Sequence, residues 1–202
     1  MPELTTDPML LTLVAVLSYL LGSVPFGVVI TRAMGLGDLR QIGSGNIGAT
    51  NVLRTGNKAA AAATLILDAA KGGVAVLLAR ALLGEDAAQM AALTSFLGHL
   101  YPVWLRFRGG KGVATFFGTL LALAWPVGLA ACATWLVVAA LLRISSVAGL
   151  AAAGSSTGWM LLFGRSEMFF LGVVLTALIY WKHRENMVRI KAGTEPRIGS
   201  KR

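Results

Sequence analysis

The chain consists mainly of long apolar runs that are separated by short polar segments. The first run covers residues 9–31, about 23 positions, which is long enough for a helix to cross the hydrocarbon layer of a membrane. Glu3 and Asp7 precede it and no small-x-small cleavage site closes it, so we expect a retained helix and not a cleaved signal peptide. Six further apolar runs predict helices, at residues 59–83, 90–107, 113–125, 126–142, 145–163 and 168–181.

The fourth run is short. It holds only about 13 residues, fewer than a full membrane crossing needs, so we expect this helix to begin below the membrane interface. Seven membrane helices is the simplest count. Five full crossings is the alternative, with the fourth helix and one neighbour only partly inserted.

Composition indicates a membrane protein. Of the 202 residues 56% are hydrophobic and only 13% are charged, so we expect one compact, all-α, polytopic membrane domain over residues 1–202. The net charge of +9 must then lie on few surfaces, against anionic lipid headgroups or around anionic substrates. Cys132 is the only cysteine and there are two histidines, which excludes a disulfide framework and argues against a zinc site.

Basic residues gather in alternate loops. The loops after the first, third and fifth runs contain Lys or Arg, as does the tail from Lys182 onward, whereas the N-terminus and the segment 84–89 are acidic. Because positive loops mark the cytoplasmic face, we expect the N-terminus outside and the C-terminus in the cytoplasm. Arg165 is a mild exception to this pattern.

The first polar loop has the sequence GSGNIGATNVLR, residues 43–54. Its three glycines permit positive φ angles and close approach of a ligand, and its hydroxyl and amide side chains are short hydrogen-bonding groups. Such a loop can surround a phosphate with N–H donors, and Arg54, about one helical turn beyond Thr50, can close over the same anion. The alternative is a polar turn between two helices, without a ligand.

Two polar features interrupt the apolar runs. Asp68 and Lys71 lie about one helical turn apart in the second run, and charges at membrane depth are costly, so we expect a structural ion pair. His99 lies in the third run, where a buried histidine bonded to a neighbouring helix is the expected role.

A second glycine-rich segment, RGGKGVAT, covers residues 108–115. Its glycines expose backbone N–H groups around Lys111 at a predicted helix start, an arrangement that suits a phosphate. It differs from a nucleotide-binding P-loop because neither Ser nor Thr follows Lys111. The alternative is a positive anchor at a helix end, which does not need glycines on both sides of the lysine.

The third polar segment begins at His183, directly after the last run. On a continuing helix His183, Asn186 and Arg189 are three residues apart and share roughly one face. A charged segment that stops a membrane helix explains the arginines but not His183 and Asn186. With the expected topology, all three polar segments lie on one side of the membrane, which indicates a site that handles phosphate.

Five segments together resemble the motifs of the bacterial membrane glycerol-3-phosphate acyltransferase family that uses acyl phosphate. They follow one another in order and spacing from Leu20 to Arg189: GSVPFG (22–27), GSGNIGATNVLR (43–54), Gly98-His99 with Pro102, GGKGVAT (109–115) and HREN (183–186). The resemblance implies transfer of a fatty acyl group from acyl phosphate to the sn-1 hydroxyl of glycerol 3-phosphate. The products would be lysophosphatidic acid and phosphate, in the first acylation of phospholipid biosynthesis.

For this reaction we expect the loop at residues 43–46 to hold the phosphate of the acyl donor and Lys111 to offset the charge of the departing phosphate. Arg54, His183 and Asn186 would bind glycerol 3-phosphate and aim its hydroxyl at the acyl carbon. The base is either a phosphate oxygen of the donor or His183. The expected catalytic residues are Ser44, Lys111, His183 and Asn186, and the expected substrate ligands are Gly43, Gly45, Asn46, Thr50, Asn51, Arg54, Gly109, Gly110, Gly112, Thr115 and Arg189.

No metal or cofactor is expected, because the cations belong to the protein and no carboxylate cluster suited to magnesium is visible. The expected partners are acyl phosphate, glycerol 3-phosphate and the lipid bilayer, and not nucleic acid. The oligomeric state is open, with a monomer as the simplest expectation. The main alternative function is a small transporter of phosphate or organophosphate anions, although no inverted repeat is visible. A non-catalytic lipid-binding scaffold would leave Ser44 and Asn186 unexplained.

Overall fold

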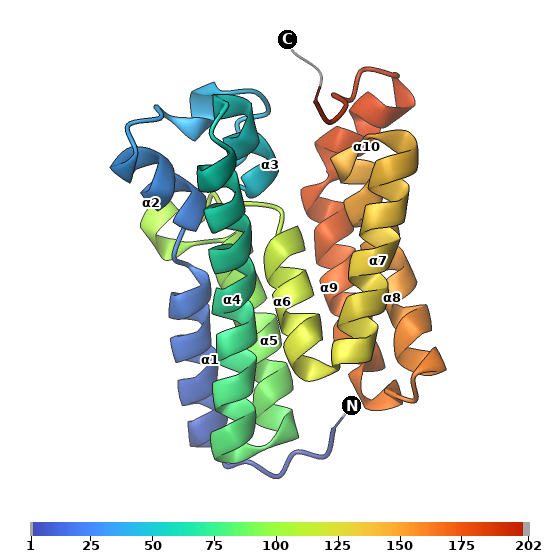
Figure 1. Cartoon of the computed structure of the whole chain (residues 1–202). Coiled ribbons are helices and arrows are strands. Elements are labelled where there is room, and N and C mark those ends of the chain that lie inside the picture. Colours follow the sequence, from blue (N-terminus) through green and yellow to red (C-terminus); the bar gives the residue numbers. More distant parts are fainter. Residues whose placement is uncertain (1, 200–202) are drawn as a thin grey trace. The chain divides into compact units, whose positions relative to one another are not determined.

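The computed structural model describes residues 2–199, and these residues form helices and loops without a strand. The expected all-α fold is therefore confirmed for this part of the chain. The helices divide into two compact units, residues 2–123 and the residues from Ala124 onward (Figure 1). Each unit has buried apolar side chains of its own, such as Val76 and Phe96 in the first and Met160 and Leu175 in the second.

In the first unit α4 runs antiparallel to α1 and α5, and shorter helices lie at one end of these three (Figure 1). The elements are α1 (Pro8–Gly22), α2 (Phe26–Ala33), η1 (Leu39–Gln41), α3 (Ala49–Val52), η2 (Leu53–Thr55), α4 (Lys58–Leu83), α5 (Glu85–Leu100), η3 (Val103–Leu105) and α6 (Val113–Leu123).

The helix expected over residues 9–31 is interrupted, although the segment Pro8–Ala33 is long and apolar enough to cross a membrane. α1 ends at Gly22 and α2 begins at Phe26. Pro25 explains the break, because proline has no N–H to donate and disfavours helical backbone at Val24. The N–H of Ser23 still donates to the carbonyl of Tyr19 at 2.8 Å, which closes the last turn of α1.

Small residues let the helices of the first unit approach closely. A Cβ atom at Gly22 in α1 would collide with the backbone of Ser95 in α5. One at Gly118 in α6 would collide with the backbone of Ala69 in α4. Such small-residue contacts are typical of helices that pack inside membranes.

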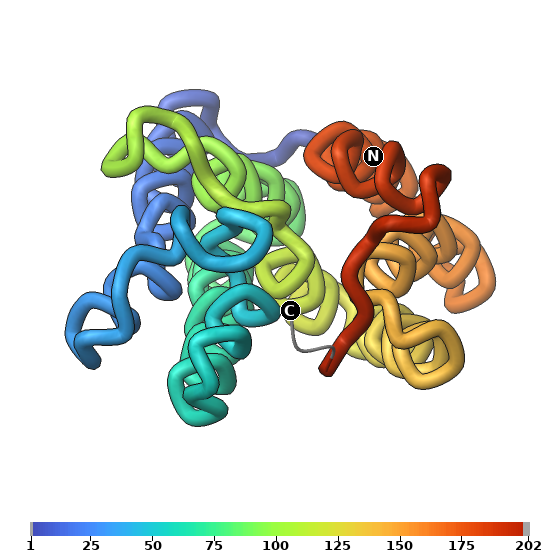
Figure 2. The backbone as a smooth tube through the Cα atoms, turned by 90° about the horizontal axis from the view of Figure 1, so that it is seen from above, coloured from blue at the N-terminus to red at the C-terminus, as the bar shows by residue number. Residues whose placement is uncertain are grey.

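The third helix is displaced from its predicted range of 90–107. α5 begins at Glu85, because Glu85 and Asp86 suit the positive end of the helix dipole, and it ends at Leu100, before Pro102. The short fourth helix is confirmed as α6, which begins part-way down α4 (Figure 1). The polar loops of residues 34–57 and 101–112 consequently lie at the same end of this unit (Figures 1 and 2).

The second unit contains three long helices that pack side by side, as seen end-on in Figure 2. They are α7 (Trp125–Leu142), α8 (Ser145–Leu162) and α9 (Phe169–Lys182), followed by α10 (Arg184–Lys191), and η4 (Ser166–Met168) precedes α9. Their bounds agree with the predicted runs to within a residue. α10 is a separate helix, because the helical path is broken at His183. The continuing helix on which the sequence analysis placed His183, Asn186 and Arg189 together is therefore broken at His183, and Asn186 and Arg189 lie on α10.

Three segments of the described residues are long and apolar enough to cross a membrane: Pro8–Ala33, Lys58–Leu83 and Trp125–Leu142. α6 is a shorter apolar helix. Large apolar side chains such as Leu82 and Leu141 are exposed on the long helices, as expected for surfaces that contact lipid chains. The count of seven crossings and the outside position of the N-terminus remain predictions.

Candidate active site

The first polar loop is closed around the buried side chain of Asn51. Its Nδ2 group donates to the backbone oxygens of Leu39, Ile42 and Asn46 at 2.9, 2.9 and 2.7 Å. Its Oδ1 atom accepts the N–H of Ser44 at 3.1 Å. Because both ends of the amide are engaged within the loop, the geometry favours a bracing role for Asn51 over the expected contact with substrate.

Two of the three glycines of this loop have the positive φ angle that the sequence analysis expected. Gly43 and Gly45 have φ angles of 54° and 68°, whereas Gly48 has an extended backbone with φ −83°. Some of the N–H groups expected to face a phosphate donate inside the loop, such as Gly45 to Ile42 O at 2.9 Å and Ile47 to Asn46 Oδ1 at 3.0 Å. The side chains must therefore supply part of the binding that the sequence assigned to the backbone.

Arg54 lies against the beginning of the loop, as its spacing predicted. Its Nη1 atom donates to Asn51 Oδ1 at 3.2 Å, and its side chain covers Gly43, where a Cβ atom would approach the guanidinium to 2.5 Å. Ser44 and Thr50 are exposed on the same loop. The loop therefore presents two exposed hydroxyl groups and a guanidinium, groups that suit a phosphate.

The glycines of the second polar loop pack against α5. The N–H groups of Gly109 and Gly110 donate to the last two carbonyl groups of that helix, each at 3.1 Å. A Cβ atom at Gly110 would collide with His99 Nε2, and one at Gly112 would collide with the ring of Phe96. Contact with the helix therefore requires these glycines, independently of any ligand.

Lys111 is partly exposed beside these glycines and precedes α6, the helix start that the sequence predicted. Thr115 is fully buried, and its hydroxyl donates to the carbonyl of Asp68 at 2.9 Å. This contact joins α6 to α4. The geometry therefore favours a packing role for Thr115 over the expected contact with substrate.

A buried charge cluster lies beneath the second loop. Asp68 Oδ1 is 2.8 Å from Lys71 Nζ and 3.6 Å from His99 Nδ1. Lys71 also donates to the carbonyl of Val24 at 2.8 Å, so the cluster joins α4 to α5 and to the break between α1 and α2. The expected internal ion pair is confirmed. His99 has the expected contact with a neighbouring helix.

One hydrogen bond links the two glycine-rich loops. Arg40, in η1 just before the first loop, donates from Nη2 to the carbonyl oxygen of Arg108 at 2.7 Å. Ser44, Arg54 and Lys111 thus belong to two loops that the first unit holds together at one end (Figure 2). This arrangement brings the first two sequence motifs together.

In the second unit His183 is buried where α9 gives way to α10. Its Nδ1 atom is 2.8 Å from the carbonyl oxygen of Ile179. Since a carbonyl only accepts, Nδ1 carries the hydrogen in this contact. The backbone carbonyl of Ile179 thus orients the ring.

Asn186 and Arg189 meet at a carboxylate that the sequence analysis did not single out. Glu195 accepts hydrogen bonds from Asn186 Nδ2, from Arg189 Nε at 2.7 Å and from Ser146 Oγ at 2.7 Å. Burial alone would raise the pKa of Glu195. The three hydrogen bonds and the charge of Arg189 outweigh this effect, so its pKa lies below the ordinary value.

Ser146 and Glu195 are the polar residues that sequence reasoning missed at this position. A signal for Glu195 was present, because it is the only acidic residue after Glu185 in a strongly basic tail. An isolated carboxylate among cations is a reasonable candidate for an ion pair. Ser146 carries no such signal, since it lies in a small-residue helix. Within residues 2–199, no three His, Cys, Asp or Glu side chains are grouped so that they could hold a metal ion.

The structure thus groups the predicted residues in two sets. Ser44, Arg54 and Lys111 belong to the linked loops of the first unit, and Asn186 and Arg189 share Glu195 in the second. The assignment of both sets to one reaction remains a prediction, as do the individual roles.

Known proteins resemble this chain over nearly its whole length. A family model described as glycerol-3-phosphate acyltransferase matches residues 12–193. Glycerol-3-phosphate acyltransferases of Cereibacter sphaeroides and Ruegeria pomeroyi are 68% and 64% identical over 201 residues, which is 100% of this chain and 96% and 99% of theirs.

Two solved structures resemble the chain in fold. One is PlsY (YgiH), described as an integral membrane glycerol 3-phosphate acyltransferase in its glycerol 3-phosphate form, with 38% identity, a TM-score of 0.89 and coverage of 94% of this chain and 96% of that chain. The lysophosphatidic acid form of PlsY has 38% identity, a TM-score of 0.87 and coverage of 94% and 95%. This chain therefore belongs to the membrane glycerol-3-phosphate acyltransferase family of the PlsY type.

Proposed function

We propose that the chain transfers a fatty acyl group from acyl phosphate to the sn-1 hydroxyl of glycerol 3-phosphate. The acceptor oxygen forms a bond to the acyl carbon, the bond between that carbon and the phosphate oxygen breaks, and the hydroxyl proton passes to a base. Inorganic phosphate and lysophosphatidic acid are released. The related crystal structures support the acceptor and the product, because they are described as glycerol 3-phosphate and lysophosphatidic acid forms.

The observation that carries this proposal is the hydrogen bond between Arg40 and Arg108, which joins the two glycine-rich loops. It keeps the exposed Ser44 hydroxyl and Lys111 at one end of an apolar unit, where an amphiphilic phosphate ester can reach both. In the proposed reaction the first loop and Arg54 hold phosphate, and Lys111 offsets the charge that develops on the departing group. Neither Ser nor Thr follows Lys111, so the segment differs from a nucleotide-binding P-loop. This difference favours acyl phosphate over a donor that contains a nucleotide.

The second unit contributes His183 and Asn186 to the proposed reaction, with a role in binding glycerol 3-phosphate. The contact of His183 Nδ1 with the carbonyl of Ile179 orients the ring for this role. Met187 stands four residues after His183, so the sequence has no aspartate at the spacing of a histidine-aspartate acyltransferase box, which favours a binding role over that of a general base. A phosphate oxygen of the donor is then the proposed base.

We infer that the enzyme acts as a multi-pass protein of the bacterial inner membrane, with seven crossings, its N-terminus outside and its active site on the cytoplasmic side. The basic loops and tail support this orientation. A single cysteine at Glu3 should react with an impermeant thiol reagent added outside, and one at Lys191 should not, once Cys132 has been replaced. Both positions are exposed. The reverse labelling pattern would overturn the orientation.

A product assay tests the proposed function. The purified protein is given glycerol 3-phosphate with acyl phosphate, acyl-CoA or acylated carrier protein in parallel, and lysophosphatidic acid and phosphate are measured. We expect both products with acyl phosphate and poor turnover with the other donors. Comparable turnover with acyl-CoA would refute the donor assignment. Phosphate flux across vesicles without lysophosphatidic acid would refute the enzyme in favour of a transporter.

A further inference from the structure

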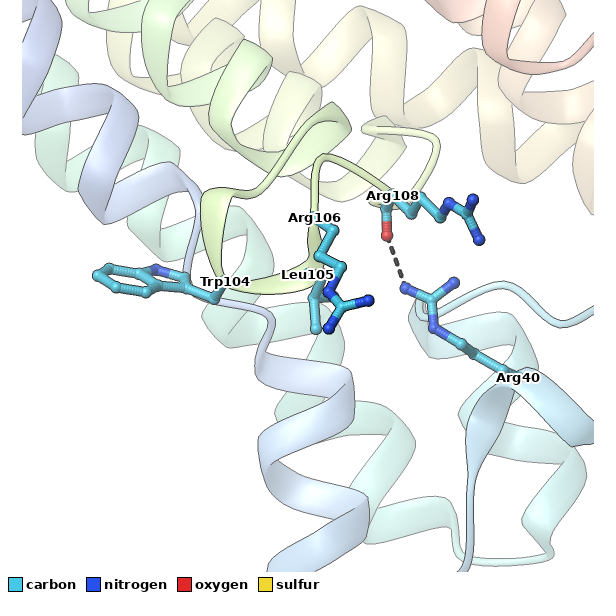
Figure 3. A pocket seen from close by; sticks show the side chains of 5 residues that line it. All are labelled: Arg40, Trp104, Leu105, Arg106 and Arg108. Atoms are coloured by element: carbon cyan, nitrogen blue, oxygen red, sulfur yellow. Dashed lines mark hydrogen bonds between the residues drawn. The ribbon is translucent and has the colours of Figure 1, made fainter.

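A polar cavity lies outside the residues assigned to acyl transfer. It has a volume of about 400 Å³ and is lined by Arg40, Trp104, Leu105, Arg106 and Arg108 (Figure 3). All five residues belong to the first unit, from η1 and from the turn that follows α5. Three guanidinium groups and two apolar side chains therefore border one space.

The backbone around Arg106 is held in an uncommon conformation. Arg106 and Phe107 have φ angles of 52° and 62°, in the left-handed region that few residues other than glycine adopt. The N–H of Phe107 donates to Pro102 O at 3.0 Å and the N–H of Arg108 to Leu105 O at 3.1 Å, so the turn is fixed by its own hydrogen bonds. Such conformations persist where the surrounding structure specifies them, often at binding sites.

The charge of this cavity is not balanced by the protein. Within residues 2–199, no carboxylate forms an ion pair with Arg40, Arg106 or Arg108. Arg40 donates from Nη2 to the backbone carbonyl of Arg108, a contact with a neutral group that leaves the charge of Arg40 unchanged. Three like charges around one space favour an anion there, and the planar guanidinium group matches phosphate oxygens.

Aromatic side chains on the same turn indicate the rest of the ligand. Trp104 is 62% exposed and Phe107 is 59% exposed. Exposed aromatic residues in a membrane protein typically lie at the level of the lipid headgroups. A free phosphate ion gains nothing from contact with these apolar groups or with Leu105. A lipid that bears a phosphate has an anionic headgroup for the arginines and an apolar chain that can pack against the apolar side chains.

We propose that Arg40, Arg106 and Arg108 bind the phosphate headgroup of an anionic lipid, with Trp104 and Leu105 against the start of its acyl chain. The shared chemistry is a lipid phosphate, which is a diester in a bulk anionic phospholipid and a monoester in lysophosphatidic acid. This site is additional to the proposed acyl transfer and does not depend on which acyl donor the enzyme uses.

Arg106 and Arg108 give the sharpest test. Within residues 2–199 neither guanidinium forms a hydrogen bond or an ion pair with the protein, so the double variant Arg106→Gln/Arg108→Gln removes charge without removing such a contact. Arg40 is left intact because it holds the loops. The matched control is Arg32→Gln/Lys58→Gln, two exposed cations of the same unit that do not line the cavity.

Binding is measured on the full-length protein in phosphatidylcholine nanodiscs, with fluorescent phosphatidylglycerol, fluorescent lysophosphatidic acid and inorganic phosphate as three separate probes. The double variant should weaken binding of the lipid phosphates about 10- to 30-fold, since each cation near a membrane surface is worth on the order of fivefold. The control should change binding by less than about threefold. Inorganic phosphate should not be retained.

The two lipid probes distinguish the sources of the headgroup. If the double variant binds both lipid probes more weakly, the site is a general lipid-phosphate site. If only the binding of lysophosphatidic acid is weaker, the site is specific for a phosphate monoester. Equal losses in the double variant and the control would overturn the proposal, because only the general surface charge would then matter. Tight binding of inorganic phosphate through these arginines would also overturn it. No turnover is measured, so failure here is separate from failure of the product assay.

Discussion

Asp68→Ala should strongly destabilise the protein, because it removes the anion from the buried cluster. Asp68 and Lys71 are 2.8 Å apart, and only 3% and 1% of their side-chain surfaces are exposed. After the substitution the ammonium group keeps its hydrogen bond to Val24 O and lies 5.8 Å from the ring centroid of Phe26. Neither contact supplies the negative charge that a buried cation needs.

The size of the effect follows from the burial. Removing one partner of a buried ion pair costs about 3–5 kcal/mol, because the other charge stays buried without compensation. An exposed pair contributes about 0–1 kcal/mol. The pair of Arg165 and Glu167 is the internal control, since its atoms are 3.7 Å apart and its side chains are 49% and 34% exposed. Glu167→Ala should therefore cost less than about 1 kcal/mol.

The free energy of unfolding of both variants is measured in the same mixed micelles by denaturant titration. A third variant, Asp68→Leu/Lys71→Met, removes both charges and should recover most of the loss, because apolar replacements of a buried pair are often neutral. The reasoning is refuted if Asp68→Ala costs no more than Glu167→Ala. It is also refuted if the double variant is as unstable as the single one, since packing and not charge would then explain the loss.

Four further predictions concern Lys111, His183, Glu195 and Asp86. Lys111→Ala should lower kcat about 100-fold or more in a folded protein, and unchanged turnover would leave Lys111 a membrane anchor. His183→Gln should mainly raise KM for glycerol 3-phosphate, whereas a kcat loss of about 100- to 10,000-fold at constant KM would make His183 the base. Glu195→Gln should raise the same KM about tenfold, because its three donors lose the anion that holds them; a lower KM would show that the carboxylate competes with substrate. Backbone hydrogen bonding from Thr6 lowers the pKa of Asp86, at the start of α5, to about 2. The stability it contributes is present above its ordinary pKa of about 3.9 and is lost as the pH falls toward 2, so Asp86→Asn should flatten the stability curve in that interval.

The sequence predicted most helices well because apolar length dominates their formation. The run at residues 59–83 corresponds to α4 (Lys58–Leu83) with a one-residue difference. The errors in helix bounds occurred where one or two residues determine the start or end of a helix independently of the apolar pattern. Pro25 divides the first helix, and the acidic residues at the start of α5 are a helix signal that the sequence analysis assigned to a loop.

The site was harder to predict than the helices, because a polar residue type does not show which way its side chain faces. Ser44 was expected to be catalytic and Asn51 to contact substrate, yet Asn51 is buried with its amide engaged and Ser44 is exposed. The sequence marked Glu195 as an isolated carboxylate in a basic tail, but only the structure identifies Asn186 and Arg189 as its partners. Spacing predicts which residues share a helix face, but not which distant group meets that face.

The hydrogen bonds of the polar side chains in the loops distinguish residues that stabilise the site from residues that can contact substrate. Inside a membrane protein, a polar group must be satisfied by the fold or must face water or ligand. Asn51 and Thr115 are satisfied by backbone carbonyls, so their loss should appear first as instability. Ser44 is exposed, and its hydroxyl has only a weak 3.4 Å contact with Asn51 Oδ1. Substitution of Ser44 therefore leaves the hydrogen bonds of Asn51 in place, so a change in activity would reflect contact with substrate. Ser44 is thus a better position than Asn51 for testing the reaction, although the two residues belong to one motif.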